Sequence, residues 1–390
     1  MEDCQKYSVL VDGYKWYPGH LADYIRNLKK VNPLVDITLT TSRPLTEFPK
    51  DICDNTKEIV QIPTYSGRIK NNAVCKAIES FLYAKVFAFL SFKNKFDIVN
   101  IHYPSPRVFH AIPWMKRMSD HIVLTPWGSD VLRAKKSEIR RMCKIYDAAD
   151  YVTVDPDSQL CIEVITKFSC KATKILPFIW GMEYVDYLRE MTPTDTVEES
   201  KERFGLKGRY VITCGYNSRL AQRHKAIICA VSRIKDKLPN NLTLLFPFTY
   251  GKLTREGYDQ ELLALCKENR LDGMVINDFL TYPDLYKLRN ATDMFVHVQT
   301  TDAASACVMQ YILCHKKIVH GSWMRYNDLE EYKPLFYFPV NHIEELGQVI
   351  LSAYQSDPIK ISPKLIDSIM DRGWSRTMKE LNARFESVLT

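Results

Sequence analysis

Two polar side chains near the C-terminal end of the chain are spaced to act on one ligand. Asp302 and Gln310 have seven residues between them and bracket a short turn and an apolar helical stretch. A helix starting near Ala303 would offer free backbone N–H groups and a partial positive charge, which suit an anionic diphosphate. The small residues Ala303, Ala304 and Ser305 would let that ligand approach the backbone closely. The alternative is an ordinary strand–helix unit whose helix is capped by Asp302.

A second turn, at residues 215–225, brings two cations together. A predicted strand runs into Gly215 and Asn217, and Arg219 and Lys225 then lie six residues apart across the start of a predicted helix. Fixed cations stabilise the charge that grows on a leaving diphosphate. Cations at a helix start oppose the helix dipole unless an anion is bound there, which favours a phosphate site over the alternative of a solvated basic turn.

Strands and helices that alternate along the whole chain must hold these residues in position. Apolar runs separated by helical stretches are typical of a parallel α/β sheet. Strands are predicted at 7–11, 35–40, 58–62, 97–101, 121–125, 151–154, 210–214, 242–246, 274–276, 293–298 and 317–319. Residues 183–207 are polar and acid-rich without a strand pattern, so we expect an interdomain linker there. His102 ends a predicted central strand, and open α/β sheets bind ligands beyond the carboxyl ends of their strands.

Composition bounds the class of protein. The 390 residues, 46% hydrophobic and 25% charged, suffice for two α/β domains. The eleven cysteines contain no Cys-x-x-Cys pair, which argues against a disulfide framework and a zinc ribbon and favours a reducing cytoplasm. The chain has no signal segment at its start and no apolar run of about eighteen residues. No Gly-x-Gly-x-x-Gly follows the first strand, which disfavours a nicotinamide dehydrogenase.

The net charge of +7 is unevenly distributed. Residues 1–180 contain 26 Lys and Arg against 19 Asp and Glu, whereas residues 181–390 contain 27 of each kind. Basic regions bind nucleic acid, anionic lipid or phosphorylated substrates. No nucleic-acid motif is present, so a membrane or a phosphorylated substrate is favoured over nucleic acid. A solvated basic surface is the alternative.

Several segments, spread over most of the chain, resemble motifs of the GT-B glycosyltransferases of the large retaining family 4 (glycosyl transferases group 1). These segments occur in the same order as the motifs of that family. Asp302 and Gln310 stand at its two glutamates, and Lys317 begins its Lys-Pro-Val. The other similar segments are 96–102, 121–130, 148–154, 175–181, 203–206 and Trp374. The resemblance implies two Rossmann-like domains facing each other across a cleft, with a C-terminal helix crossing back to the first. The expected boundaries are 1–182 for the acceptor domain, 183–207 for the linker, 208–365 for the donor domain and 366–390 for the crossover helix.

The resemblance also implies roles for single residues. Arg219 and Lys225 would hold the donor diphosphate, and Gln310 its ribose. The catalytic residues would be Asp302, His102 and Asp130. Asp302 would lie near the donor sugar, and His102 and Asp130 would lie on the acceptor side. The remaining donor-site residues would be Gly215, Asn217, Ala303, Ala304 and Ser305. The glycine-rich, aromatic loop at 12–20 and the turn at 127 would supply the acceptor-binding residues Trp16, Tyr17, Gly19, His20 and Trp127; a purely structural turn is the alternative for the loop.

Two positions depart from the family pattern. Trp127 replaces a histidine that contacts the transferred sugar, although an indole could stack on a pyranose face. Gln310 replaces the second glutamate; an amide still pairs with a ribose but brings no charge. A deoxyribose donor such as a dTDP-sugar therefore stays open.

Other polar groups invite simpler explanations. Asp155-Pro-Asp157 has the Asp-x-Asp form of a manganese site, but a proline-containing turn explains it, so we expect no metal and no cofactor. His297, His315 and His320 are expected to be packing or surface residues rather than ligands.

The stretch 74–92 is too apolar for an ordinary surface helix and too short and charged to span a bilayer. With the basic cluster 133–144 it would suit docking on an anionic membrane. A helix packed in the domain core is the alternative.

Together these features predict a metal-independent, retaining, hexosyltransferase-type enzyme. It would move a sugar from a nucleoside-diphosphate sugar to a saccharide acceptor, which could be lipid-linked, in bacterial surface polysaccharide biosynthesis. We expect it in the cytoplasm, at the inner face of the membrane, without nucleic acid as a partner. The alternatives are a GT-B nucleotide-sugar epimerase and a non-catalytic GT-B subunit that binds a partner glycosyltransferase.

Overall fold

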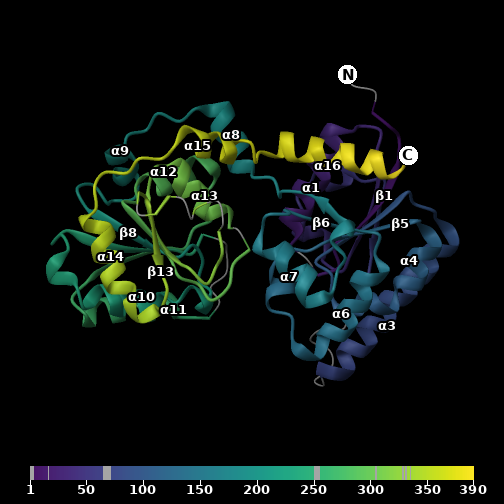
Figure 1. Cartoon of the computed structure of the whole chain (residues 1–390), viewed down its shortest axis with the longest axis horizontal. Helices are drawn as coiled ribbons and strands as arrows, with labels where there is room; N and C mark the ends of the chain where they lie inside the picture. The colour runs from purple at the N-terminus through teal and green to yellow at the C-terminus, as the bar shows by residue number, and fades with distance from the viewer. Residues whose placement is uncertain are drawn as a thin grey trace. The chain divides into compact units, whose positions relative to one another are not determined.

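The computed structural model describes residues 4–15, 17–64, 72–249, 255–303, 305–326, 329, 332–333 and 335–390. The chain forms two compact units (Figure 1). Unit 1 consists of Met1–Gly181 and Trp374–Thr390, and unit 2 of Met182–Gly373. Each unit is built around its own parallel sheet.

Within the described residues, seven parallel strands form the sheet of unit 1 in the order β3-β2-β1-β4-β5-β6-β7. The strands are β1 (Ser8–Asp12), β2 (Asp36–Thr41), β3 (Glu58–Gln61), β4 (Ile98–His102), β5 (His121–Thr125), β6 (Tyr151–Val154) and β7 (Ile175–Pro177). The helices are α1 (Pro18–Val31), α2 (Ile52–Asn55), α3 (Asn72–Lys93), α4 (Ile112–Met118), α5 (Ser129–Leu132), α6 (Lys136–Ala148), α7 (Gln159–Phe168) and α16 (Trp374–Val388).

Both faces of this sheet are covered by apolar cores. Leu10 on β1 belongs to the core under α3, α4 and α6, whereas its neighbours Val9 and Val11 belong to the core under α1 and α16. Successive strand residues point to opposite faces, so one strand contributes to both cores. This arrangement explains why the strands read as continuous apolar runs rather than as alternating ones.

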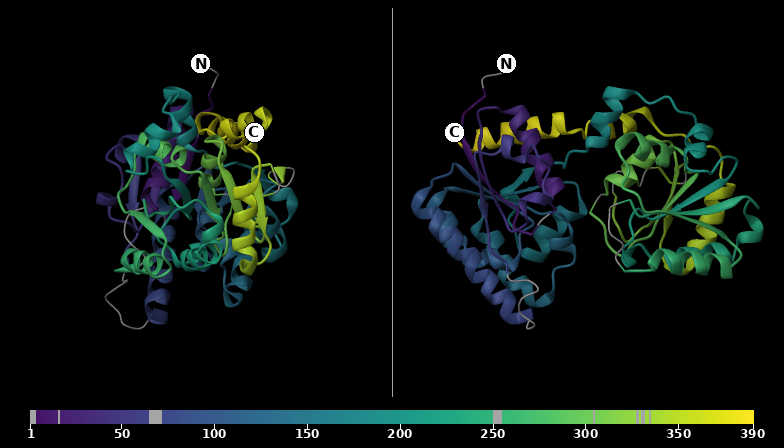
Figure 2. Two further views of the ribbon diagram at one scale, coloured as in Figure 1. Left: turned by 90° about the vertical axis from the view of Figure 1, so that its left-hand side faces the viewer. Right: turned by 180° about the vertical axis from the view of Figure 1, so that it is seen from behind.

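The last helix of the chain belongs to unit 1, where it packs against α1 (Figures 1 and 2). The Tyr7 hydroxyl donates a hydrogen bond of 2.8 Å to the Asn382 side-chain oxygen. At the start of the helix the Trp374 ring lies against Gly181, where a Cβ would approach it to 2.3 Å. Only glycine fits at that position, which explains the glycine that closes the turn after β7.

Unit 2 has the sheet order β10-β9-β8-β11-β12-β13, again all parallel, among the residues that the structure describes. Its strands are β8 (Tyr210–Cys214), β9 (Leu242–Pro247), β10 (Asp272–Ile276), β11 (Met294–His297), β12 (Lys317–Gly321) and β13 (Tyr337–Val340). Its helices are α8 (Glu183–Met191), α9 (Val197–Arg203), α10 (His224–Ser232), α11 (Tyr258–Glu268), α12 (Tyr282–Asn290), α13 (Ala306–Leu313), α14 (Leu346–Gln355) and α15 (Pro363–Met370).

The structure differs from the sequence predictions at several elements. Most of the stretch 183–207, expected as a linker, is helical in α8 and α9 and belongs to unit 2. The short edge strands β7 and β13 were not predicted, because each contains a proline, which argues against a strand when the sequence alone is read. The helix expected from residue 303 begins at Ala306 instead. Its N-cap is Ser305, whose hydroxyl accepts from the Cys307 N–H at 3.2 Å.

The strand orders locate one switch point in each sheet. In unit 1 the order reverses between β1 and β4, and in unit 2 between β8 and β11. The loops that follow neighbouring strands diverge there, which opens a crevice at the carboxyl ends of the strands. The crevices of unit 1 and unit 2 are therefore where ligands are expected.

All eleven cysteines are free thiols. Among the described residues, no helix combines the length and the apolar character that crossing a bilayer requires.

Candidate active site

The loop after β1 borders the crevice of unit 1. Gly19 lies at the start of α1, where the Tyr17 ring comes so close that a Cβ would meet it at 2.9 Å. The Tyr17 side chain is 53% exposed, and its ring centroid lies 5.1 Å from that of His20. His20 in turn lies 5.4 Å from the Trp127 ring, and burial lowers the pKa of His20 to about 4. Three predicted acceptor residues, Tyr17, His20 and Trp127, thus lie in contact.

His102, at the end of β4, is buried and has a defined tautomer. The Asn100 amide donates to Val123 O at 3.3 Å, and a carbonyl only accepts, so the Asn100 oxygen faces His102 Nε2 at 2.8 Å. Nε2 therefore carries the proton and donates to Asn100. Burial lowers the pKa of His102 to about 3, so the ring is neutral. Its Nδ1 is an acceptor without a partner in the described structure.

Aromatic rings surround this histidine. The Trp180 ring centroid lies 3.8 Å from that of Trp127 and 6.0 Å from that of His102. Tyr24 on α1 approaches His102 to 4.5 Å and donates its hydroxyl to Asn100 at 3.0 Å. Neutral aromatic rings therefore gather around His102 at the carboxyl ends of β4 and β5.

Asp130 is a buried carboxylic acid in the first turn of α5. Its Oδ1 accepts from the Trp127 N–H at 3.0 Å, whereas its Oδ2 is buried without a hydrogen-bond partner in the described part of the chain. Burial raises the pKa of Asp130 to about 7, although backbone N–H groups of the turn lower it. The group therefore changes protonation near neutral pH, which a residue that exchanges a proton with a hydroxyl requires.

A second buried carboxyl holds the loop after β1 in place. Asp12 accepts from the Thr40 hydroxyl at 2.7 Å and from the Tyr83 hydroxyl of α3 at 2.6 Å. Lys15 reaches Glu79 of α3 at 2.7 Å. Burial raises the pKa of Asp12 to about 6, against these donors. The inner face of α3 thus anchors the loop that contains the predicted acceptor residues.

In unit 2, the turn after β8 is shaped by glycine and amides. Gly215 has φ +65°, a backbone conformation that favours glycine, and the Gln222 side chain lies against it. The Asn217 side chain accepts from the Arg219 N–H at 3.0 Å, which closes a local turn. Thr300 N–H donates to Ala221 O at 3.0 Å and so ties this turn to the loop after β11.

Two arginines follow that turn. Arg219 is exposed and forms no ion pair with any residue that the structure describes. Arg223 has φ +59° and directly precedes α10, and its guanidinium lies 4.8 Å from the Trp323 ring centroid. Lys225, which was predicted to bind the diphosphate, forms an ion pair with Glu261 of α11 instead. The diphosphate contact of Lys225 stays a prediction, and Arg223 is a second cation beside the same turn.

Asp302 lies in the loop between β11 and α13, with both carboxylate oxygens engaged. Oδ1 accepts from the Ala303 N–H at 2.9 Å, and Oδ2 accepts from the Ser305 N–H at 3.3 Å and from the Tyr326 hydroxyl. His297 Nε2 lies 3.4 Å from Oδ2. The carboxylate therefore organises the loop, and it accepts from the Ala303 and Ser305 amides, two of those expected to bind phosphate.

Gln310 is buried in the middle of α13 rather than open to solvent. Its Oε1 accepts from Arg289 Nε at 3.1 Å, and a second Arg289 nitrogen donates to the Tyr311 hydroxyl at 2.9 Å. Arg289 is fully buried. The ribose contact of Gln310 stays a prediction, and in the structure its amide oxygen satisfies a buried guanidinium.

The remaining predictions are placed as follows. Trp16 and Ala304 lie outside the described residues. His297 and His320 are buried side by side with ring centroids 5.1 Å apart, as expected for packing residues. Asp155 accepts from the Asp157 N–H at 3.1 Å, as in a local turn.

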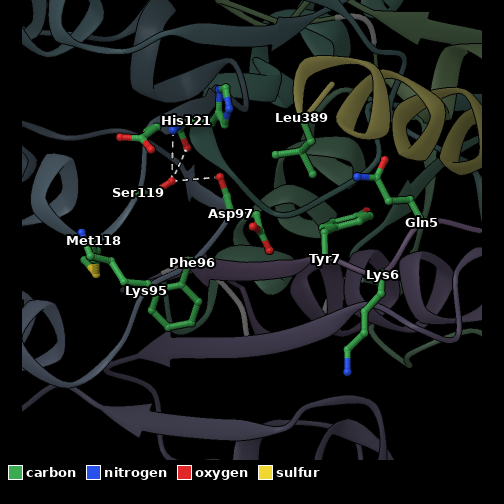
Figure 3. Close-up of a pocket in the computed structure, with 11 residues that line it drawn as sticks. Gln5, Lys6, Tyr7, Lys95, Phe96, Asp97, Met118, Ser119, His121 and Leu389 are labelled. Atoms are coloured by element: carbon green, nitrogen blue, oxygen red, sulfur yellow. Dashed lines mark hydrogen bonds between the residues drawn. The ribbon is translucent and has the colours of Figure 1, made fainter.

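Figure 3 shows a pocket at the opposite end of the sheet of unit 1. Its volume is ≈ 360 Å³, and its lining comes from segments 5–7, 95–97 and 118–121, with Leu389. These segments precede β1, β4 and β5, so the pocket lies at the amino ends of the strands. Ligands of open α/β sheets bind at the carboxyl ends, which sets this pocket apart from the candidate site.

Known proteins resemble this chain in part of its sequence and in its fold. Residues 18–155 match the family described as Glycosyl transferase 4-like. A glycosyltransferase from Rickettsia africae superposes with a TM-score of 0.73 at 16% identity, covering 99% of each chain. The chain has the GT-B fold, and residues 18–155 are similar to the Glycosyl transferase 4-like family.

Two further GT-B structures resemble the chain over nearly its whole length. Anabaena HepE, in complex with UDP and glucose, superposes with a TM-score of 0.64 at 13% identity and covers 98% of each chain. The lipopolysaccharide outer core galactosyltransferase WaaB gives a TM-score of 0.66 at 13% identity, covering 98% of this chain and 99% of WaaB. A comparison with curated proteins by sequence finds no significant match. The resemblance to GT-B glycosyltransferases inferred from the sequence motifs is thus confirmed.

Proposed function

We propose that the protein transfers a sugar from a nucleoside-diphosphate sugar, bound in the crevice of unit 2, to a saccharide hydroxyl in the crevice of unit 1. The observation that carries the proposal is the pair Arg219 and Arg223 beside the turn after β8. Two guanidinium groups that follow the turn at a switch point would suit the charge of a diphosphate. The UDP complex of the similar HepE structure supports this choice of ligand.

The chemistry requires the C1–oxygen bond to the diphosphate to break while C1 bonds to the acceptor oxygen. Arginines fixed at the leaving diphosphate stabilise the negative charge that develops there. These cations supply the stabilisation without a metal, and we propose a metal-independent, hexosyltransferase-type reaction with retention.

On the acceptor side, His102 and Asp130 are the polar groups with capacity to spare. His102 Nδ1 would accept a hydrogen bond from one acceptor hydroxyl, and Asp130 Oδ2 would bond to a second. Asp302 stays a candidate near the donor sugar, but its oxygens are already bonded within their own loop. We therefore assign the proton-exchanging role to Asp130 and a loop-ordering role to Asp302.

The setting that we propose is surface polysaccharide assembly at the inner face of a bacterial cytoplasmic membrane. The excess positive charge of the first 180 residues and the similarity to WaaB support it.

The test combines binding with turnover. Ligands that bind the folded state raise the melting temperature, so UDP, GDP, dTDP, ADP and CMP are compared on the wild type and on Arg219→Ala. We expect one nucleoside diphosphate to stabilise the wild type and to lose that effect in the variant. The matching sugar donor should then be consumed only when a saccharide acceptor is present.

Other outcomes point to the two alternatives. Conversion of the donor alone into an isomer would identify an epimerase. Absence of any shift and of turnover would contradict the donor site and favour a non-catalytic subunit.

A further inference from the structure

We propose that unit 1 docks on an anionic lipid bilayer through the outer face of α3. The inference rests on the proposed function and adds to it a defined surface and a lipid class. Binding of the protein to vesicles tests this surface without an assay of sugar transfer. The helix is the long element at the edge of unit 1 (Figures 1 and 2).

The outer face of α3 exposes large aromatic rings. Phe81, Phe89 and Phe92 are 58%, 58% and 65% exposed. Their spacings of eight and three residues place them on one side of the helix. Within the described residues, Phe279 of unit 2 is the other phenylalanine with comparable exposure. Such exposure on one helix is unusual for a surface that meets only water.

Each of these rings has a cation above it. Lys85 Nζ lies 4.6 Å from the Phe81 centroid and Lys93 Nζ 4.3 Å from that of Phe89. The guanidinium of Arg117, on α4, lies 4.2 Å from the Phe92 centroid. Long basic side chains can turn from the rings to phosphate groups while the rings enter the acyl boundary.

The charge of the helix selects an anionic partner. Glu79 is the one acidic residue in the sequence of α3, and its side chain is 3% exposed because it points inward to Lys15. No carboxylate of α3 therefore opposes a negatively charged surface. An acidic lipid headgroup matches both the cations and the adjacent apolar rings, whereas a neutral protein surface would match only the rings.

The inner face of α3 shows why the outer rings stay exposed. Tyr83 and Phe87 are fully buried in the core of unit 1, and Tyr83 is bonded to Asp12. The helix is thus held in one orientation and cannot turn its outer phenylalanines inward. The inner face of α3 is thus the core helix that the sequence offered as one alternative for 74–92, and the outer face is exposed for the membrane contact that we propose.

Vesicle flotation tests the inference. Full-length protein is mixed with vesicles of phosphatidylcholine alone or with an equal share of phosphatidylglycerol. We expect binding to the anionic vesicles only, weakened by salt. The triple variant Phe81→Ser, Phe89→Ser, Phe92→Ser should lose about tenfold or more in affinity. Lys85→Gln and Lys93→Gln should each lose about fivefold.

Controls separate docking from damage. Phe279→Ser, which removes an equally exposed ring from unit 2, should bind vesicles like the wild type. All variants should keep the melting temperature and its shift with nucleotide, so a failed donor site and a failed membrane surface give different results. Wild-type protein that ignores anionic vesicles, or a triple variant that still floats, would overturn the inference. A dimer that the triple variant abolishes, without vesicle binding, would overturn it in favour of a second copy.

Discussion

The two crevices lie at sheets with the same order of their first six strands, but their side chains differ in chemistry. In unit 1 the carboxyl ends of the strands present neutral aromatic rings, a neutral histidine and a carboxyl with a pKa of about 7. In unit 2 the corresponding edge presents two arginines and a bonded carboxylate. Under the proposed function, the same scaffold would supply one surface for an uncharged ring with hydroxyls and another for a diphosphate. Function resides in the loops at the switch points, not in the fold.

The largest effect should come from the cations of unit 2. Arg219→Ala should lower kcat by about 10²–10³, on the order of 3–4 kcal/mol, because charge on the leaving diphosphate loses a fixed partner. Arg223→Ala should have an effect of similar size. Lys225→Ala is the matched control, since its ammonium is paired with Glu261, and steady-state kinetics with the identified donor should show less than about a threefold change. Equal losses at 219 and 225 would support the assignment of Lys225 to the diphosphate that was made from the sequence.

The buried amide of unit 2 should affect stability more than catalysis. Gln310→Ala leaves the buried Arg289 without one acceptor and should lower the free energy of unfolding by about 1–3 kcal/mol. Denaturant unfolding measures this loss, with the exposed helical residue Gln260→Ala as control. A large loss of nucleotide affinity at unchanged stability would instead place Gln310 on the ribose.

Within unit 1, Trp127→Ala should raise KM for the acceptor about tenfold and leave KM for the donor unchanged, because stacking surface is lost on one side only. Trp127→Phe retains a ring and should recover most of the affinity. Initial rates with each substrate varied in turn measure the two constants. A rise in donor KM alone would contradict the division of roles between the crevices.

The smallest effect should be a change in pH dependence. The pKa of Asp130 is raised in the folded state to about 7, so the stability it contributes is fully present below the ordinary carboxyl pKa and is lost as pH rises through about 7. Asp130→Asn keeps the acceptor for the Trp127 N–H but cannot ionise. The melting temperature of the wild type should therefore fall relative to this variant between about pH 5 and pH 8.

Asp36→Asn is the control for that titration. Its Lys57 partner lowers the pKa of Asp36, so the difference between this variant and the wild type should be flat over the same range. A flat difference for Asp130→Asn as well would mean that Asp130 ionises normally in the folded protein.

Much of the fold was accessible from the sequence, because the patterns that define it are local. The predicted strands at 121–125, 151–154 and 210–214 match the structure, and others differ by one or two residues at their ends. Helix and strand periods appear within single elements, and parallel strands put their carboxyl ends on one edge of the sheet. His102 and Arg219 could therefore be placed near the carboxyl ends of strands from sequence position, whereas Asp130 was placed by the resemblance to GT-B glycosyltransferases.

Pairings between distant segments could not be predicted, because they leave no local pattern in the sequence. Lys225 pairs with Glu261, 36 residues away, whereas Arg223 lies over the Trp323 ring. Asn100 was a polar residue within an apolar run, a signal that could have suggested a role beside His102. Trp180 entered only as part of a turn, although its ring packs on Trp127.

The sequence by itself determined two parallel α/β sheets, the order of their elements and the edge at which chemistry would occur. The tertiary structure decided which side chains are available there. It pairs Lys225 with Glu261, buries Gln310 against Arg289, sets the tautomer of His102 and turns three phenylalanines of α3 outward. Such pairings join segments far apart in the chain, and their geometry exists only once both cores have packed.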